Sequence, residues 1–116
     1  MISVPKRILL AREAVDFRKQ IDGLAALCEQ RLNEEPLDGT LFLFINRRKT
    51  AIKALIWTRG GFVLLYKRLE KGRFWWPDGD GSDRVFLSRA RLAGLVEGLD
   101  LSSAKELDRW NPRHQS

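Results

Sequence analysis

The sequence predicts a single α+β domain in which a long helix precedes an antiparallel β-meander and a second helix follows it. Apolar residues at spacings of three and four over residues 16–33 are typical of an amphipathic helix. Three apolar runs between residues 40 and 69, separated by short turns, are typical of a meander. A second helical pattern covers residues 88–99, and 116 residues suffice for one modest hydrophobic core.

The N-terminal part of the domain is predicted to contain a short strand and the longer helix. The apolar run "RILLA" (7–11) is interpreted as a strand. Asp16 is the predicted N-cap of the helix, and Pro36 in "EEPLDG" cannot continue it. Cys28 lies on the apolar stripe, so we expect it in the core rather than as a nucleophile.

The meander is predicted from three runs rich in aliphatic and aromatic residues, which are "TLFLFI" (40–45), "AIKALIW" (51–57) and "FVLLYKRL" (62–69). The connecting turns are "NRRKT" (46–50) and "TRGG" (58–61), whose glycines accept positive φ angles. Because all three runs are apolar on both faces, we expect the sheet to be covered on each side, at least in part.

The C-terminal part is predicted to close the domain. "DGDGSD" (78–83) is interpreted as a loop and "RVF" (84–86) as a short strand. Ser88 is the predicted N-cap of the second helix. We therefore expect one domain over residues 1–100, followed by a polar tail over residues 101–116.

Positive charge is concentrated in the middle of the chain. The net charge is +6, but residues 39–77 contain nine cations and one acid, Glu70, and so carry +8. Concentrated charge of one sign indicates a polyanionic partner such as a nucleic acid. The alternative is a solvated sheet edge, whose lysines and arginines discourage aggregation.

The topology of the meander predicts that two cationic segments, residues 47–49 and 67–73, meet at one end of the sheet. They meet because the third strand returns to the first turn. Trp75 and Trp76 follow that strand. Neighbouring side chains of an extended segment point to opposite faces, so we expect one tryptophan in the core and the other available for stacking. Phosphate contact and stacking together suit a nucleic-acid surface. The predicted nucleic-acid-binding residues are Arg47, Arg48, Lys49, Lys53, Lys67, Arg68, Lys71, Arg73, Trp75 and Trp76.

Two further cations occupy the first turn of the predicted N-terminal helix. Arg18 and Lys19 either contact an anion or a partner at the helix N-terminus, or Arg18 pairs with Asp22 four residues on. The sequence is compatible with both arrangements.

The sequence offers little for catalysis or metal binding. An EF-hand loop starting at Asp78 needs Gly at its sixth position and Glu at its twelfth, where the chain has Asp83 and Arg89. The single cysteine and a single histidine, His114, argue against a zinc site or a histidine base. We therefore expect no catalytic residue, no metal and no cofactor.

The chain also lacks the patterns of membrane and secreted proteins. No apolar run is long enough to span a bilayer, and the N-terminus does not resemble a signal peptide. A lone cysteine fits a reducing compartment. We expect a cytoplasmic protein with no membrane partner.

Four segments of the chain resemble a known family, and these are "VDFRKQIDGL" (15–24), "LFLFINRRKTAIKALIW" (41–57), "GFVLLYKRLEKGRFWWP" (61–77) and "LVEGLD" (95–100). They are similar to the small accessory protein, often called TnpB, that bacterial insertion sequences of the sixty-six family encode in their second reading frame. The resemblance implies a role in DNA transposition beside a separate DDE-type transposase, with no catalytic residues in this chain. Many members carry an Asp-Gly type turn where this chain has "TRGG", and the tail matches only loosely.

Two functions are compatible with these observations. In the first, the protein is a non-catalytic accessory factor that binds DNA at the transposon ends. In the second, the same surface, or the helix face around Arg18, binds the transposase without contacting DNA. A third possibility, a nuclease that uses Asp78, Asp80 and Asp83, has no recognisable site geometry.

Overall fold

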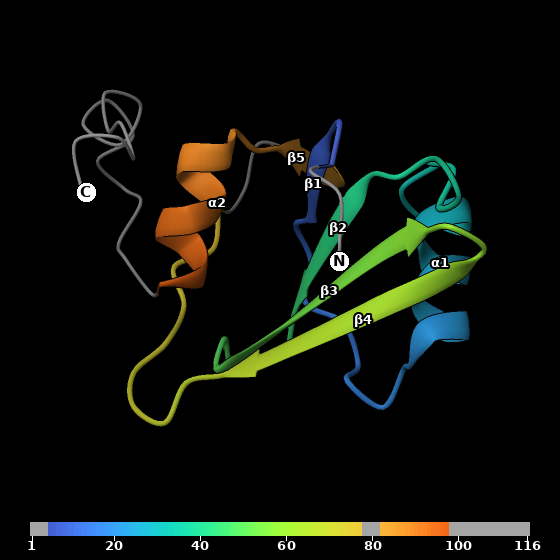
Figure 1. The fold of residues 1–116 in the computed structure, drawn as a ribbon. Helices are drawn as coiled ribbons and strands as arrows, with labels where there is room; N and C mark the ends of the chain where they lie inside the picture. Colours follow the sequence, from blue (N-terminus) through green and yellow to red (C-terminus); the bar gives the residue numbers. More distant parts are fainter. Residues whose placement is uncertain (1–4, 78–81, 98–116) are drawn as a thin grey trace.

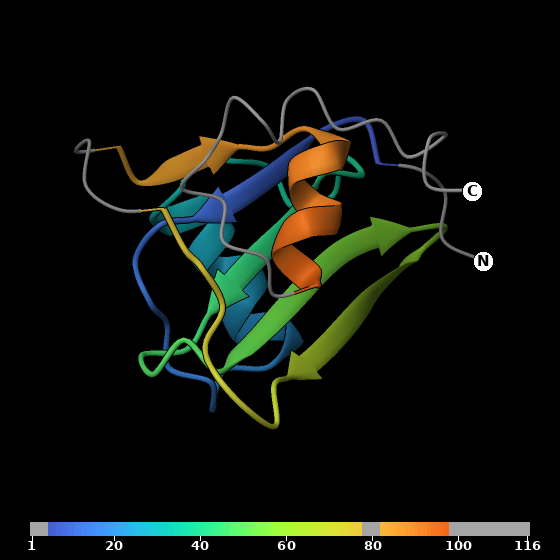
Figure 2. The same ribbon diagram turned by 90° about the vertical axis from the view of Figure 1, so that its left-hand side faces the viewer.

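The computed structural model describes residues 5–77 and 82–97. In chain order the elements are β1 (Ile8–Ala11), α1 (Ile21–Gln30), β2 (Leu41–Ile45), β3 (Ala51–Thr58), β4 (Gly61–Arg68), β5 (Arg84–Phe86) and α2 (Arg89–Val96). The five strands form one sheet with α1 and α2 on opposite faces (Figure 1). Their order across the sheet is β4-β3-β2-β1-β5, and Figure 2 shows β4 and β5 at the two edges. None of the helices described is long and apolar enough to cross a bilayer.

The predicted meander is confirmed, but it is only one part of the sheet. β2, β3 and β4 pair antiparallel in succession, with Leu43 opposite Ala54 and Ala54 opposite Leu65. β1 lies parallel to β2, with Leu9 opposite Phe42, and β5 pairs antiparallel with the other side of β1. The sheet is therefore mixed, because the chain passes from β1 through α1 to β2, the kind of crossover that parallel neighbours require.

The first helix is shorter than predicted. It begins at Ile21, and Gln20 rather than Asp16 precedes its first turn. The Asp16 carboxylate accepts a hydrogen bond from Arg18 N (2.9 Å), and Asp16 O accepts one from Lys19 N (3.0 Å). A side chain that bonds the backbone two residues ahead stabilises a turn in competition with a helix. The prediction of Asp16 as the N-cap is therefore wrong, and α1 also ends before residue 33.

The second helix begins as predicted. Ser88 Oγ accepts a hydrogen bond from Arg91 N at 3.1 Å, which identifies Ser88 as the N-cap. α2 packs on the face of the sheet opposite α1 and buries Leu95 completely. The predicted end of this helix and the predicted tail fall in residues 98–116, outside the described residues.

Side chains of each inner strand alternate between two hydrophobic clusters, one under each helix. Leu9 and Phe42 pack under α1, whereas Leu10 and Leu43 pack under α2. Burial on both faces explains why these strands are almost continuously apolar. The expectation that both faces are covered holds for β1, β2 and most of β3, but the second half of β4 is exposed.

Candidate nucleic-acid interface

Asn46 builds the turn between β2 and β3. Its Oδ1 accepts hydrogen bonds from Thr50 N (2.8 Å) and Ala51 N (3.1 Å), and its Nδ2 donates to Thr50 Oγ1 (3.0 Å). Its carbonyl accepts a bond from Lys49 N (3.0 Å), and Lys49 has a positive φ of 62°. These bonds fix the turn from within, and the two arginines that follow Asn46 are exposed.

The segment after β4 folds back against this turn. Leu69 N donates to Thr50 O (2.9 Å), and Phe74 N donates to Lys49 O (2.7 Å). Between them Gly72 has a φ of 77°, a conformation that glycine adopts without strain. The two cationic segments therefore lie side by side, as the topology of the meander predicted.

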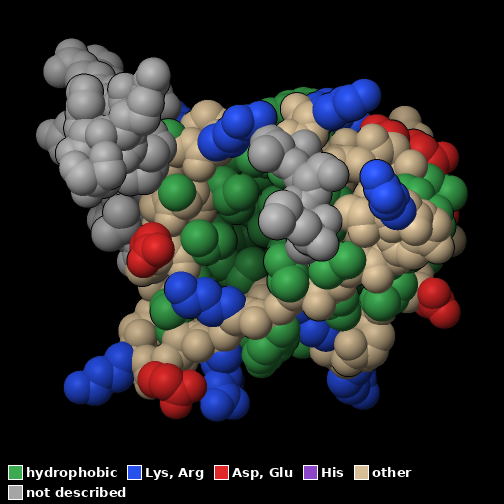
Figure 3. Space-filling model, viewed as in Figure 1, with side chains coloured by type: hydrophobic (Ala, Val, Ile, Leu, Met, Phe, Trp, Pro, Cys, Tyr) green, Lys and Arg blue, Asp and Glu red, His purple; other side chains and the backbone are tan. Residues whose placement is uncertain are grey.

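The surface formed by these segments is termed the basic end, and its members are Arg47, Arg48, Lys49, Lys67, Arg68, Lys71 and Arg73. All except the half-buried Lys49 are exposed, and Figure 3 shows lysine and arginine side chains projecting from this end of the sheet. Within the two segments the single acid is Glu70, which pairs with Arg68 at 3.3 Å. Lys67 Nζ donates to Val96 O at the end of α2. The basic end is therefore a cationic surface that two separate parts of the chain create.

Lys53 is not part of the basic end, contrary to the prediction. Its side chain is 4% exposed, and its Nζ donates to Phe17 O (2.8 Å) and Lys19 O (2.7 Å). The ammonium also lies 5.0 Å from the centroid of the Phe17 ring. Burial lowers the pKa of Lys53. The lysine therefore connects β3 to the turn before α1 and is not available to a phosphate.

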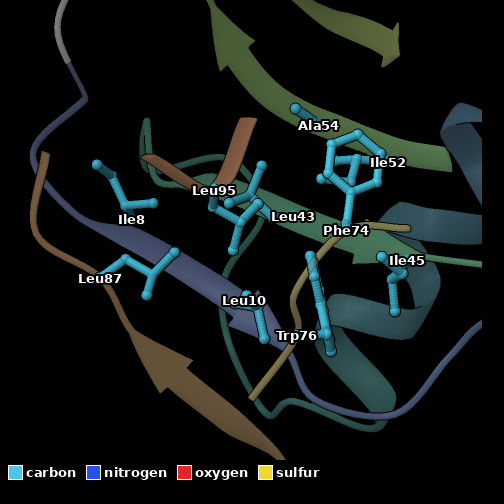
Figure 4. Packing of buried hydrophobic residues seen from close by; sticks show 10 residues of the cluster. All are labelled: Ile8, Leu10, Leu43, Ile45, Ile52, Ala54, Phe74, Trp76, Leu87 and Leu95. Atoms are coloured by element: carbon cyan, nitrogen blue, oxygen red, sulfur yellow. The ribbon is translucent and has the colours of Figure 1, made fainter. Parts of the chain in front are cut away.

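The two tryptophans differ in exposure, as expected of one core residue and one surface residue. Trp76 is 5% exposed and packs beside Phe74 under α2 (Figure 4). Its Nε1 lies within hydrogen-bonding distance of Ala11 O (3.1 Å) and Arg12 O (3.2 Å). Trp75 is half-buried against the same cluster, so the expectation that the two rings lie on opposite faces is only partly met. Trp76 is a core residue, and Trp75 is the partly exposed one.

A hollow of about 440 Å³ lies beside the basic end. Residues 14–18 line one side and residues 46–48 line the other, and the two segments are joined where Val15 N donates to Ile45 O (2.9 Å). The hollow brings Arg18 to the same region as two members of the basic end. It is termed the arginine hollow below.

Arg18 pairs with Asp16, so the predicted pair with Asp22 is wrong. Arg18 Nη2 lies 2.6 Å from Asp16 Oδ2, and hydrogen bonds from Arg18 lower the pKa of Asp16 to about 2. Because α1 begins only at Ile21, Arg18 and Asp22 are not neighbours on a helix. The Arg18 side chain remains 91% exposed, and Lys19 is exposed as well.

The described residues offer little support for a metal site or a catalytic nucleophile. No three His, Cys, Asp or Glu side chains within residues 5–77 and 82–97 come close enough to hold a metal ion. Asp78 and Asp80 lie outside the described residues. Cys28 is fully buried under α1, and burial raises the pKa of its thiol to about 12. Since only a thiolate is a good nucleophile, Cys28 is a core residue, as predicted.

Comparison with known proteins assigns the chain to a family. Residues 6–106 match the family described as "IS66 Orf2 like protein". The chain belongs to this IS66 family. Two curated relatives come from Sinorhizobium fredii (strain NBRC 101917 / NGR234). "Uncharacterized protein y4hO" is 36% identical over 107 residues, which cover 91% of this chain and 90% of the relative. "Uncharacterized protein y4jC" is 35% identical over 100 residues, which cover 85% and 84% of the two chains.

Membership of the IS66 Orf2-like family confirms the resemblance that the sequence motifs indicated. It associates the protein with the transposition of insertion sequences, as an accessory protein. No solved structure shows a significant match to the chain.

Sequence reasoning missed the residues that hold the basic end in place. Asn46 and Thr50 were included in the predicted turn but given no role. The available signal was an asparagine at the first position of a strand-to-strand turn, since Asn side chains commonly bond the backbone of turns. The contribution of Asp16 to the arginine hollow was hidden because its pattern also fits a helix N-cap.

Proposed function

We propose that this IS66 Orf2-like protein is a non-catalytic accessory factor that binds DNA at the ends of its insertion sequence through the basic end. The observation that carries the proposal is the bond from Phe74 N to Lys49 O, which joins two distant segments into one exposed cationic surface. Clustered lysines and arginines release counterions from a phosphate backbone, which is the main source of sequence-independent affinity for DNA.

The turn arginines and the neighbouring Trp75 would contact DNA in different ways. Arg47 and Arg48 stand on a turn that side-chain bonds hold rigid, so their guanidinium groups are well placed for bidentate contact with phosphates. Trp75 is the more exposed of the two tryptophans that follow β4, so it would stack on a base where the transposon end is distorted or single-stranded. Phosphate contacts fix position without reading sequence, so we expect modest preference for the transposon end.

Fluorescence anisotropy of a labelled transposon-end duplex, titrated from low to physiological salt, tests the proposal. If about four phosphates are neutralised, the slope of log K against log salt is about −3 to −4. The double variant Arg47→Glu/Arg48→Glu should lose most of this affinity and flatten the slope.

A matched control separates the basic end from net charge. Lys6 and Arg89 are exposed and lie near the start of β1 and the start of α2, at the opposite end of the sheet. The variant Lys6→Glu/Arg89→Glu makes the same change in charge and should bind nearly as the wild type does. Equal loss in both variants, or a wild-type slope near zero, would overturn the proposal. A scrambled duplex measures any preference for the end.

A second function assigns the same surface to the element's transposase instead of DNA. The arginine hollow favours it, because Val15 and Phe17 line the hollow together with arginines, and mixed apolar and charged walls suit a side chain of another protein. Its test is co-purification with the transposase after nuclease treatment, comparing wild type with Arg18→Ala and Trp75→Ala. A complex that survives nuclease, from a protein that binds no DNA at low salt, would establish this second function.

A further inference from the structure

β4 is an edge strand with an apolar and accessible outer side. It runs for eight residues, and among the described residues only β3 pairs with it. Leu65 is 49% exposed and Tyr66 is 58% exposed. Long apolar edges are normally shortened, bulged or interrupted by proline in monomeric proteins. β4 has none of these protections between residues 62 and 66, and its register with β3 is unbroken.

The hydrogen-bond pattern with β3 shows which peptide groups face outward. Leu69 N donates to Thr50 O, and along an antiparallel ladder bonded pairs alternate with non-bonded pairs. Residues 61, 63, 65 and 67 therefore direct their N–H and C=O groups at β3. The residues that direct theirs away from the sheet are Phe62, Leu64, Tyr66 and Arg68. β4 thus offers a regular row of outward donors and acceptors.

The apolar run on this edge is symmetric about Leu64. An aromatic residue stands at each end, an aliphatic residue follows on each side, and the run is Phe62-Val63-Leu64-Leu65-Tyr66. Two copies paired antiparallel about Leu64 would place Phe62 opposite Tyr66 and Val63 opposite Leu65. Such aromatic and aliphatic cross-strand pairs stabilise sheets. The outward N–H and C=O groups of these residues would meet each other in bonded pairs.

The cations that flank the run disfavour one of the two neighbouring registers. Pairing about Leu64 places Lys67 opposite Gly61 of the second copy, where no charge or side chain opposes it. Pairing about Val63 would bring Lys67 opposite Arg59 of the second copy. Pairing about Leu65 would bring Arg68 opposite Phe62 of the second copy. Like charges directly opposite each other destabilise a sheet, so pairing about Val63 is disfavoured. Pairing about Leu65 instead loses the aromatic pair of Phe62 with Tyr66.

We propose that a second copy of this chain binds to β4 by antiparallel pairing about Leu64, so that two five-stranded sheets join into one continuous sheet. A two-fold interface must be complementary to itself, and the symmetric run with its outward peptide groups meets this requirement. The pairing also brings Arg59 of the second copy beside Arg68, so each basic end gains a cation from the other chain. The proposal goes beyond DNA binding and stands without it.

Sedimentation velocity of the full chain tests the association. At about 5 to 100 μM, a range that brackets the affinity of a modest interface, the wild type should sediment as a dimer in growing proportion. Leu65→Lys places a cation on the edge opposite Val63 and should weaken dimerisation about tenfold or more. Leu37→Lys is the matched control, because Leu37 is 50% exposed and lies outside the sheet. A monomeric wild type, or a dimer that Leu65→Lys leaves unchanged, overturns the proposal.

Disulfide trapping tests the register independently of these variants. In pairing about Leu64, the two Cα atoms of Leu64→Cys would lie about 5.5 Å apart, within the range of a disulfide. The two copies of Tyr66→Cys would lie about 14 Å apart, four residues along the strand and one strand across, and should not crosslink. Cys28 is buried and should take no part. Efficient crosslinking of Tyr66→Cys without that of Leu64→Cys contradicts the proposed register, and crosslinking of neither contradicts the interface.

Discussion

Lys53 Nζ donates to the carbonyl oxygen of Lys19 at 2.7 Å. A buried lysine therefore stabilises the turn that carries Arg18, one of the residues lining the arginine hollow. Replacing Lys53 with Met keeps the aliphatic stem but leaves this carbonyl and that of Phe17 without their donor. Each unsatisfied buried group is costly, so we expect Lys53→Met to lower the free energy of unfolding by about 1–3 kcal/mol. Urea denaturation measures the change.

Lys71→Met is the control for this variant. Lys71 is an exposed member of the basic end, so its loss should change stability by less than about 0.5 kcal/mol. Under the proposed function, the two variants should differ in their effect on DNA binding. Lys71→Met should reduce the salt slope by about 0.9 if that lysine contacts a phosphate, whereas Lys53→Met should leave the slope unchanged. A wild-type unfolding curve for Lys53→Met would contradict the structural role assigned here.

Asn46→Ala should weaken both the fold and the basic end. The substitution removes three side-chain hydrogen bonds within the turn and leaves Thr50 N and Ala51 N without an acceptor. We expect a loss of about 1–3 kcal/mol in the free energy of unfolding. Asn46→Asp retains the acceptor oxygen and should keep most of the stability. If Asn46→Ala and Asn46→Asp unfold at the same urea concentration, the side-chain bonds are not what holds the turn.

Glu34 connects two arginines, Arg7 directly before β1 and Arg84 in β5. Its carboxylate lies 2.9 Å from Arg7 Nη2 and 2.8 Å from Arg84 Nε. The Nε–H group of Arg84 makes no hydrogen bond to it, so the contact with Arg84 Nε is an ion pair only. The Glu34 side chain is 10% exposed. Removing its charge takes the carboxylate from Arg84 and leaves Arg7 paired with Asp38 (3.1 Å), so Glu34→Gln should destabilise the fold by about 1–3 kcal/mol.

Glu70→Gln provides a comparison for Glu34→Gln with the same chemistry on the surface. The Glu70 side chain is 82% exposed and pairs with Arg68 at 3.3 Å, in the geometry of a solvent-screened pair. Exposed ion pairs contribute about 0–1 kcal/mol, so this variant should unfold almost as the wild type does. Thermal unfolding of both variants, at low and at high salt, distinguishes them. Similar midpoints for the two would mean that Glu34 is also a screened surface group.

The parts of the structure that local patterns determine were predictable from the sequence. The meander and the short strands follow from apolar runs and turn residues, and the Ser88 cap follows from one side chain acting three residues ahead. The basic end was predictable for the same reason, because a two-residue hairpin fixes where the third strand returns. Only the order of the strands and turns was needed to predict that its two segments meet.

Features that depend on distant partners were not predictable. The pattern "AIKALIW" predicts a surface position for Lys53, because its two carbonyl partners lie 36 and 34 residues away in the chain and leave no local signal. Pairing of β1 parallel to β2 depends on the crossover through α1, which no turn signal marks. Asp16 fits a helix cap and an Asx-type turn equally well, and the turn prevails in a segment that also bonds Lys53 and β2.

The Asp16 carboxyl should titrate well below an ordinary aspartate. Hydrogen bonds from Arg18 lower its pKa from 3.8 to about 2. The unfolded chain therefore binds the proton more readily, so the stabilisation from this pair is complete above pH 3.8 and is lost as pH falls towards 2. Arg18→Gln should raise the pKa of Asp16 towards 3.8, as followed by carboxyl carbon NMR. Lys19→Gln acts only through a weaker charge effect and should change it less.

Arg59 is the residue at which a substitution should stabilise the fold. It has a φ of 36° and Gly60 a φ of 82°, so both central residues of the two-residue β3–β4 hairpin have the positive φ that type I′ turns require. Asn tolerates this conformation better than Arg, and Asn-Gly is the favoured pair in such turns. We expect Arg59→Asn to raise the free energy of unfolding by about 0.5–1 kcal/mol. Urea denaturation should show a higher midpoint at an unchanged slope.

Arg59→Ala separates the backbone effect of Arg59→Asn from the loss of charge. Both variants remove one cation from an already basic chain, but alanine has no preference for positive φ. If relief of charge repulsion were the cause, the two variants would gain equally. If the backbone conformation is the cause, only Arg59→Asn should gain, and the difference should persist at high salt because backbone strain is not screened.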